Sequence, residues 1–148
     1  MFINIGIPMK FMTQTLIATS LLCAVNFAQA GVVVVVSAKS SVSNLTTEQV
    51  SDIFLGKTSR FDDGGQAVPV DQAAETADSE AFRDKVTKKS ASQLKSYWSK
   101  LVFTGKAQMP KQVSDGKEVK TLISANPNMI GYMDSSLVDS SVKVVLSL

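Results

Sequence analysis

Histidine is absent from this 148-residue chain, and the single cysteine, Cys23, lies near the N-terminus. From residue 31 onward the sequence has neither residue type, which excludes disulfide frameworks, thiolate or imidazole metal sites and histidine-based catalysis there. The chain also lacks a large excess of either charge, since 15 basic residues stand against 13 acidic ones. Nucleic-acid binding needs a larger cationic excess and is not predicted. We expect no metal and no cofactor.

A long apolar run is missing as well. Leu16 to Val25 is the N-terminal apolar stretch, and it falls short of the roughly 20 residues that a membrane-spanning helix needs. The stretch follows the only early charge, Lys10, and precedes the small residues of Ala28-Gln29-Ala30. This pattern is typical of a secretory signal peptide. We therefore expect cleavage after Ala30.

Two alternatives concern the same N-terminal segment. Met9 is a second candidate start, because Met9-Lys10 opens a more ordinary signal peptide than Met1 does. A lipoprotein signal at Cys23 is disfavoured, because Leu22 occupies a position where a small residue is wanted. On either start the predicted mature chain, 31–148, has a length suited to one domain with a single core.

Hydrophobic patterns in the mature chain alternate between strand and helix. We expect strands at about 32–36, 67–71, 129–133 and 142–146, and helices at about 47–55, 79–88, 91–104 and 116–125. Such alternation predicts an α/β layer structure with a largely parallel sheet. Pro69 has no N–H to donate, so the second strand is expected at an edge of the sheet or with irregular pairing.

The first helix has the most strongly marked ends. Thr46 and Gln49 have the spacing of a capping box, and Leu45 and Val50 have the spacing of a hydrophobic staple. Gly56 is the residue that most easily adopts the left-handed conformation after a last helical turn. The helix is therefore expected to run from about Thr47 to Leu55.

Three motifs follow one another along the mature chain: Leu45 with Asp52-Ile53-Phe54-Leu55-Gly56-Lys57, then Asp63-Gly64, then Ile130-Gly131-Tyr132. In this order and spacing they resemble the signature of phosphate-type periplasmic substrate-binding proteins of ABC importers, above all short members with about one lobe. The resemblance implies a single three-layer lobe of the type II periplasmic-binding-protein-like fold. It also implies a non-catalytic, periplasmic protein that binds phosphate or another small oxyanion for an import or sensing system.

The resemblance also implies where the ligand binds. In that family, phosphate is held by hydroxyl and backbone N–H groups at the start of the helix after the second strand, helped by an arginine. The corresponding candidates are Gln72, Thr76, Ser79 and Arg83. Arg83 can turn toward the helix start or pair with acidic neighbours at the surface.

This stretch departs from the family pattern in its charge. Asp71, Glu75, Asp78 and Glu80 place four carboxylates where the family has neutral donors, and like charge opposes a phosphate. The basic residues gather elsewhere: residues 83–120 hold ten basic and three acidic side chains. Lys106 and Lys111 in that stretch are an alternative anion patch, although solvated helix faces explain most lysines there.

A second function is therefore an alternative to ligand binding. A relative that has lost the ligand would serve as an interaction module of the cell envelope, with an ABC transporter, another envelope protein or a second copy as partner. An enzyme is not predicted. Ser92-Gln93-Leu94-Lys95 and Ser114-Asp115-Gly116-Lys117 fit the S-x-x-K form of acyl-enzymes, but the companion S-D-N motif is absent.

Overall fold

The computed structural model describes residues 31–148. The predicted signal peptide, with both candidate starts and Cys23, lies outside the described residues. The elements are β1 (Val32–Ser37), α1 (Thr47–Phe54), β2 (Val68–Gln72), α2 (Ala77–Phe82), η1 (Arg83–Thr87), α3 (Ala91–Phe103), β3 (Lys111–Val113), α4 (Gly116–Ala125), β4 (Met129–Asp134), η2 (Ser135–Leu137) and β5 (Val142–Ser147). None of the helices in this range is both long and apolar enough to cross a membrane.

One five-stranded sheet forms the centre of the molecule, in the order β3-β2-β4-β1-β5. β2 runs parallel to β3 and β4, whereas β1 runs antiparallel to β4 and β5. The predicted α/β fold is confirmed, with a mixed sheet that is only partly parallel. Strand direction depends on pairing between distant segments, which hydrophobic periodicity does not report.

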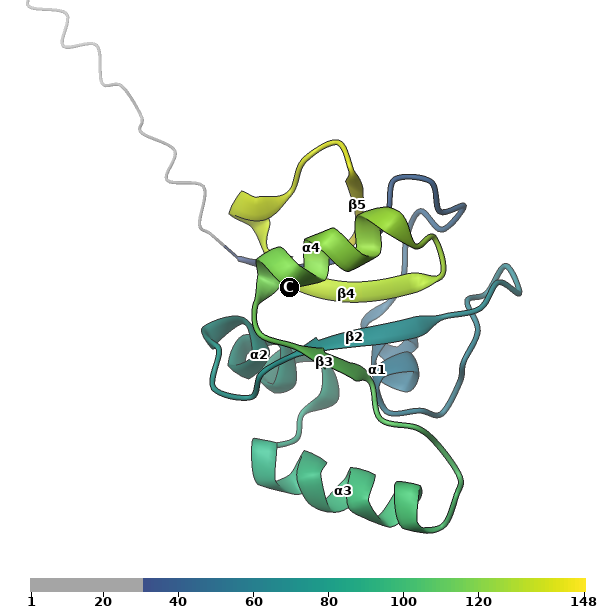
Figure 1. Cartoon of the computed structure of the whole chain (residues 1–148), viewed down its shortest axis with the longest axis vertical. Helices are drawn as coiled ribbons and strands as arrows, with labels where there is room; N and C mark the ends of the chain where they lie inside the picture. The colour runs from purple at the N-terminus through teal and green to yellow at the C-terminus, as the bar shows by residue number, and fades with distance from the viewer. Residues whose placement is uncertain (1–30) are drawn as a thin grey trace, which may run out of the picture.

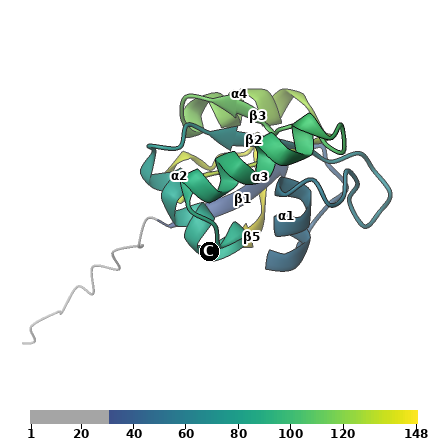
Figure 2. The same cartoon turned by 90° about the horizontal axis from the view of Figure 1, so that it is seen from below.

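β1 is buried on both faces, as its run of β-branched residues indicates. Val32, Val34 and Val36 belong to one apolar cluster, and Val33 and Val35 belong to a second on the opposite face. α1 and α2 contribute to the first cluster and α4 to the second, so the sheet is covered from both sides (Figures 1 and 2). This arrangement has the three layers expected from the sequence.

α1 has the N-terminal cap that the sequence predicts. The Thr46 hydroxyl accepts a hydrogen bond from the Gln49 N–H at 3.1 Å, and the Gln49 side chain accepts from the Thr46 N–H at 2.8 Å. Val50, Ile53 and Phe54 are buried against the sheet. Gly56, just after the helix, has a φ of +70°.

β3 was not expected from the sequence. It has three residues, two of them exposed, and β2 supplies its pairing. β3 forms the edge of the sheet and β2 is an internal strand, but β3 does not extend to Pro69, which is paired on the β4 side. The alternative, irregular pairing, is what the strand shows: β2 pairs with β4 at Val68 and Pro69 and with β3 only from Val70 onward.

The helix after β2 begins earlier and ends differently than expected. Thr76 caps α2, which starts at Ala77 rather than Ser79 and passes into a π-helical turn at Arg83–Thr87. Lys88 then takes a left-handed conformation with φ 54°. The chain thereby turns into α3.

α3 lies beyond the β3 edge of the sheet, apart from α4 and β5 (Figure 1). Two side chains fix it to the end of α1. The Tyr97 hydroxyl donates to the Leu55 carbonyl at 2.6 Å, and the Trp98 ring, 5% exposed, packs against Gly56. Trp98 therefore packs in the interior of the protein.

Candidate oxyanion site

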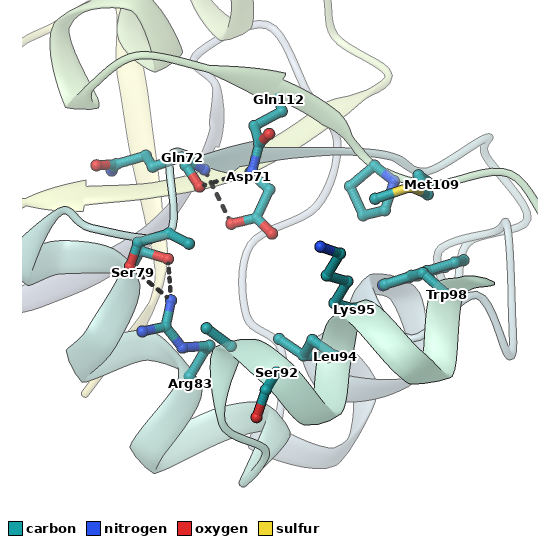
Figure 3. A pocket seen from close by; sticks show the side chains of 13 residues that line it. Asp71, Gln72, Ser79, Arg83, Ser92, Leu94, Lys95, Trp98, Met109 and Gln112 are labelled. Carbon is teal, nitrogen blue, oxygen red and sulfur yellow. Dashed lines mark hydrogen bonds between the residues drawn. The ribbon is translucent and has the colours of Figure 1, made fainter. Parts of the chain in front are cut away.

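A cavity of about 400 Å³ lies between the end of β2, the start of α2 and one face of α3 (Figure 3). Its polar lining consists of Asp71, Gln72, Ser79, Arg83, Ser92, Lys95 and Gln112. Its apolar lining consists of Ala74, Ala91, Leu94, Trp98, Met109 and Pro110. The cavity therefore joins the predicted site residues at α2 to a helix that the prediction did not include.

Asp71 places a half-buried carboxylate in this cavity. Burial raises the pKa of the Asp71 carboxyl, while hydrogen bonds from the Tyr132 hydroxyl and the Gln72 N–H and the charge of Arg83 oppose that rise. Burial, together with the neighbouring Asp71 charge, raises the pKa of Tyr132. Tyr132 also stacks on Phe82, with ring centroids 4.0 Å apart. The carboxylate is thus held in position by the aromatic part of the core.

Arg83 turns toward the start of α2. Its guanidinium donates to the Ser79 hydroxyl at 2.7 Å and to the Ala74 carbonyl at 3.0 Å. The ion pairs formed within residues 31–148 are Lys57 with Asp52 and Lys120 with Asp139. The alternative, in which Arg83 pairs with an acidic neighbour at the surface, is therefore not what the structure shows.

Lys95 is a cavity residue that the site prediction missed. Figure 3 shows its amino group pointing from α3 toward the Asp71 carboxylate. The sequence pattern that could have identified Lys95 is the spacing of Ala91, Leu94, Lys95 and Trp98. These residues line the cavity and share one face of a helix. That spacing indicates a common face but not what the face is turned toward.

Gln72 and Thr76 have other roles in the structure. The Gln72 side chain is 1% exposed, points away from the cavity in Figure 3 and donates to the Tyr132 carbonyl at 2.8 Å. The Thr76 hydroxyl accepts from the Ser79 N–H at 3.1 Å as the cap of α2 and donates to the Ala73 carbonyl at 3.0 Å. Of the four residues predicted for this site, the structure brings the side chains of Ser79 and Arg83 together in the cavity.

Of the four carboxylates at 71–80, fewer oppose an anion in the cavity than the sequence suggests. Glu75 and Glu80 are exposed and do not line the cavity. The Asp78 carboxylate accepts from the Asp134 N–H at 3.2 Å at the end of β4. Among the described residues, Asp71 is the acidic side chain that lines the cavity, where Arg83 and Lys95 also lie.

Lys106 and Lys111, the alternative anion patch, lie together on a different cavity. Its volume is about 590 Å³, and Lys57 and Arg60 line it as well. Those two residues were not predicted as members of the patch, because they follow α1 and are far from Lys106 in the sequence.

The S-x-x-K motif in α3 does not form a serine–lysine pair. In Figure 3 the Ser92 hydroxyl and the Lys95 amino group point in opposite directions, and the Ser92 hydroxyl lies 3.1 Å from that of Ser90. An acyl-enzyme needs the nucleophile and its base within hydrogen-bond reach.

Comparisons with known proteins bear on the fold. No family model matches the sequence. A phosphate ABC transporter substrate-binding protein with bound phosphate from Clostridium perfringens aligns with a TM-score of 0.63 and 23% identity, covering 78% of this chain and 44% of that one. The chain has the fold found in this substrate-binding protein. An ABC-type phosphate transport receptor from Vibrio cholerae aligns with a TM-score of 0.61 and 22% identity, over 78% of this chain and 45% of that one.

A third structure, PstS from Borrelia burgdorferi, aligns at 12% identity with a TM-score of 0.59, over 78% of this chain and 46% of that one. The predicted fold is confirmed by these alignments. The chain spans less than half the length of each of the three structures.

Proposed function

We propose that this chain is a periplasmic, non-enzymatic protein that binds phosphate or another small oxyanion for an ABC import or sensing system. The observation that carries the proposal is the cavity at the end of β2, which Ser79, Arg83 and Lys95 line and in which Arg83 is hydrogen-bonded to Ser79. The structural neighbours support it, since those proteins are substrate-binding proteins for phosphate transport.

The cavity chemistry suits a small oxyanion. A guanidinium, an ammonium and a hydroxyl are donors of the kind that recognise tetrahedral anions, and the guanidinium gives two directed hydrogen bonds. Arg83 is already oriented by its bonds to Ser79 and Ala74, so little side-chain freedom remains to be lost on binding. Apolar side chains on the α3 side, including Leu94 and Trp98, reduce the water around the charges.

One observation favours the alternative of an interaction module in the envelope. The Asp71 carboxylate lies in the same cavity and opposes an anion. In that case the partner would be an ABC transporter component, another envelope protein or a second copy of the chain.

Calorimetric titration of residues 31–148 with phosphate and with sulfate tests the proposal. We expect saturable binding by the parent chain, and we expect the double variant Arg83→Gln/Lys95→Gln to weaken it by about 10-fold or more, since each charged hydrogen bond contributes about 1.5 to 3 kcal/mol. The matched control is Lys85→Gln/Lys117→Gln, which removes the same charge from exposed positions outside this cavity.

Two outcomes would contradict oxyanion capture at this cavity. The first is a parent chain that gives no saturable heat with millimolar phosphate or sulfate, which is the result expected of an interaction module. The second is equal weakening in the test and control variants, which would indicate a general effect of net charge.

A further inference from the structure

The second cavity, separate from the candidate oxyanion site, has a cationic rim. It lies between the end of α1, the start of β2 and the segment that precedes β3. Lys57, Arg60, Lys106 and Lys111 line it, and among residues 31–148 no acidic side chain does. Four cations around one cavity are unusual in a mature chain whose positive and negative charges nearly balance.

The backbone around this cavity is held in place. Gly56 lets the Trp98 ring and the Ala107 side chain approach so closely that an added Cβ would lie 2.9 and 3.1 Å from them. This contact joins the segment after α1, which carries Lys57, to the segment that carries Lys106. Lys111 is fixed by the pairing of β3 with Val70.

Arg60 is held by its own hydrogen bonds. It forms an isolated β-bridge with Gln66, and its guanidinium donates to the Gly64 carbonyl at 2.8 Å. The four cations therefore come from two stretches of chain, 57–60 and 106–111, whose relative positions are set by packing and pairing. The backbone positions that carry the rim are set by the fold.

The protein's own carboxylates neutralise little of the positive charge of the four rim residues. Lys57 pairs with Asp52 at 3.5 Å, but both side chains are largely exposed, at 60% and 47%. Arg60, Lys106 and Lys111 take part in none of the ion pairs formed within the described residues. Neighbouring like charges repel one another, and an anion that enters the cavity relieves this repulsion.

We propose that this cavity binds a small molecule with three or more negative charges, such as a short polyphosphate or a polycarboxylate. An exposed ion pair contributes little to binding, so a ligand that engages one or two cations gains little here. A ligand long enough to reach cations on both stretches of chain combines their contributions. Affinity at this site should therefore rise steeply with ligand charge, unlike that of the oxyanion cavity.

Titrations with tripolyphosphate, citrate and orthophosphate at one ionic strength test this inference. For residues 31–148 we expect tripolyphosphate to bind about 10-fold more tightly than orthophosphate, since several weak pairs act together. The variant Arg60→Gln/Lys106→Gln should weaken tripolyphosphate about fivefold or more, and Lys85→Gln/Lys117→Gln less than about twofold. Citrate identifies the ligand class: binding like tripolyphosphate supports any polyanion, and weaker binding supports phosphate chains.

The same variants separate this site from the oxyanion cavity. Arg83→Gln/Lys95→Gln should retain tripolyphosphate binding, whatever it does to orthophosphate. The inference is overturned if the Arg60/Lys106 variant binds tripolyphosphate as the parent does, or if the Lys85/Lys117 control weakens it equally. Thermal unfolding of each variant checks that the fold is intact, above all for Arg83, which is half-buried, whereas Arg60, Lys95 and Lys106 are exposed.

Discussion

At the residue scale, Asp71 connects the core to the candidate site. The Tyr132 hydroxyl donates to its carboxylate, and Tyr132 stacks on Phe82 within the main apolar cluster. Tyr132 belongs to the Ile130-Gly131-Tyr132 motif on which the sequence resemblance rests. The motif thus has a physical role in this chain, because it orients the acidic group of the cavity.

Replacing Asp71 by Asn should change how stability depends on pH. Burial raises the pKa of the folded carboxyl above 3.8, so its contribution to stability is complete below pH 3.8 and is lost as the pH rises through the folded pKa. Asn does not titrate. The free energy of unfolding of Asp71→Asn relative to the parent should therefore increase from about pH 4 upward and then level off, with each pKa unit corresponding to about 1.4 kcal/mol.

Urea denaturation from pH 3.5 to pH 7.5 measures this effect. Asp84→Asn is the matched control, because it removes one carboxylate from an exposed position in the same region. A pH dependence that is the same in both variants would show that burial of Asp71 is not the cause.

Gly131 shows why the same motif needs a small residue. A Cβ built there would lie 2.6 Å from the Ile123 side chain and 2.7 Å from that of Val119. Both side chains are fully buried on α4, so α4 packs directly on the backbone of β4. The close contact places α4 as one of the two helical layers.

At the scale of elements, α1 combines a local signal with a core contact. Its cap was predicted from four residues of sequence, and Phe54 packs on Phe82 with ring centroids 4.7 Å apart. These two contributions can be measured separately, because Thr46 is exposed and Phe54 is buried.

We predict that Phe54→Ala lowers the free energy of unfolding by about 3 to 5 kcal/mol through a core cavity, and that Thr46→Ala lowers it by about 1 kcal/mol through loss of the cap. Chemical denaturation at neutral pH gives both values. The role assigned to α1 would be wrong if both variants were as stable as the parent.

The elements that the sequence predicted are those with strong local signals. The capping box at Thr46 and the valine run of β1 could be interpreted from neighbouring residues alone. β3 could not, because three residues with two exposed side chains carry no periodicity and depend on β2 for their pairing. The same limit applies to the sites: Lys95 lines one cavity with Arg83, and Lys57 lines another with Lys106, because the fold brings separate elements together.

At the scale of the whole molecule, the oxyanion cavity and the cationic cavity lie on either side of one segment. Met109 and Pro110 line both the oxyanion cavity and the cationic cavity. The alignments cover less than half of each larger structural neighbour, and α3 with the segment after it supplies one side of the oxyanion cavity. Trp98 and Tyr97 hold that region to the end of α1.

The position of β1 in the sheet supports cleavage of the signal peptide after Ala30. Val32 already pairs with Asp134 in the sheet, and the Gly31 carbonyl accepts from the Ser135 N–H at 2.8 Å. Cleavage after Ala30 leaves every one of these interactions in place, whereas cleavage inside β1 would remove a strand that lies between β4 and β5. We predict that the exported protein starts at Gly31. Its intact mass should equal that of residues 31–148, and a lipid-modified terminus at Cys23 or an uncut N-terminus would contradict this assignment.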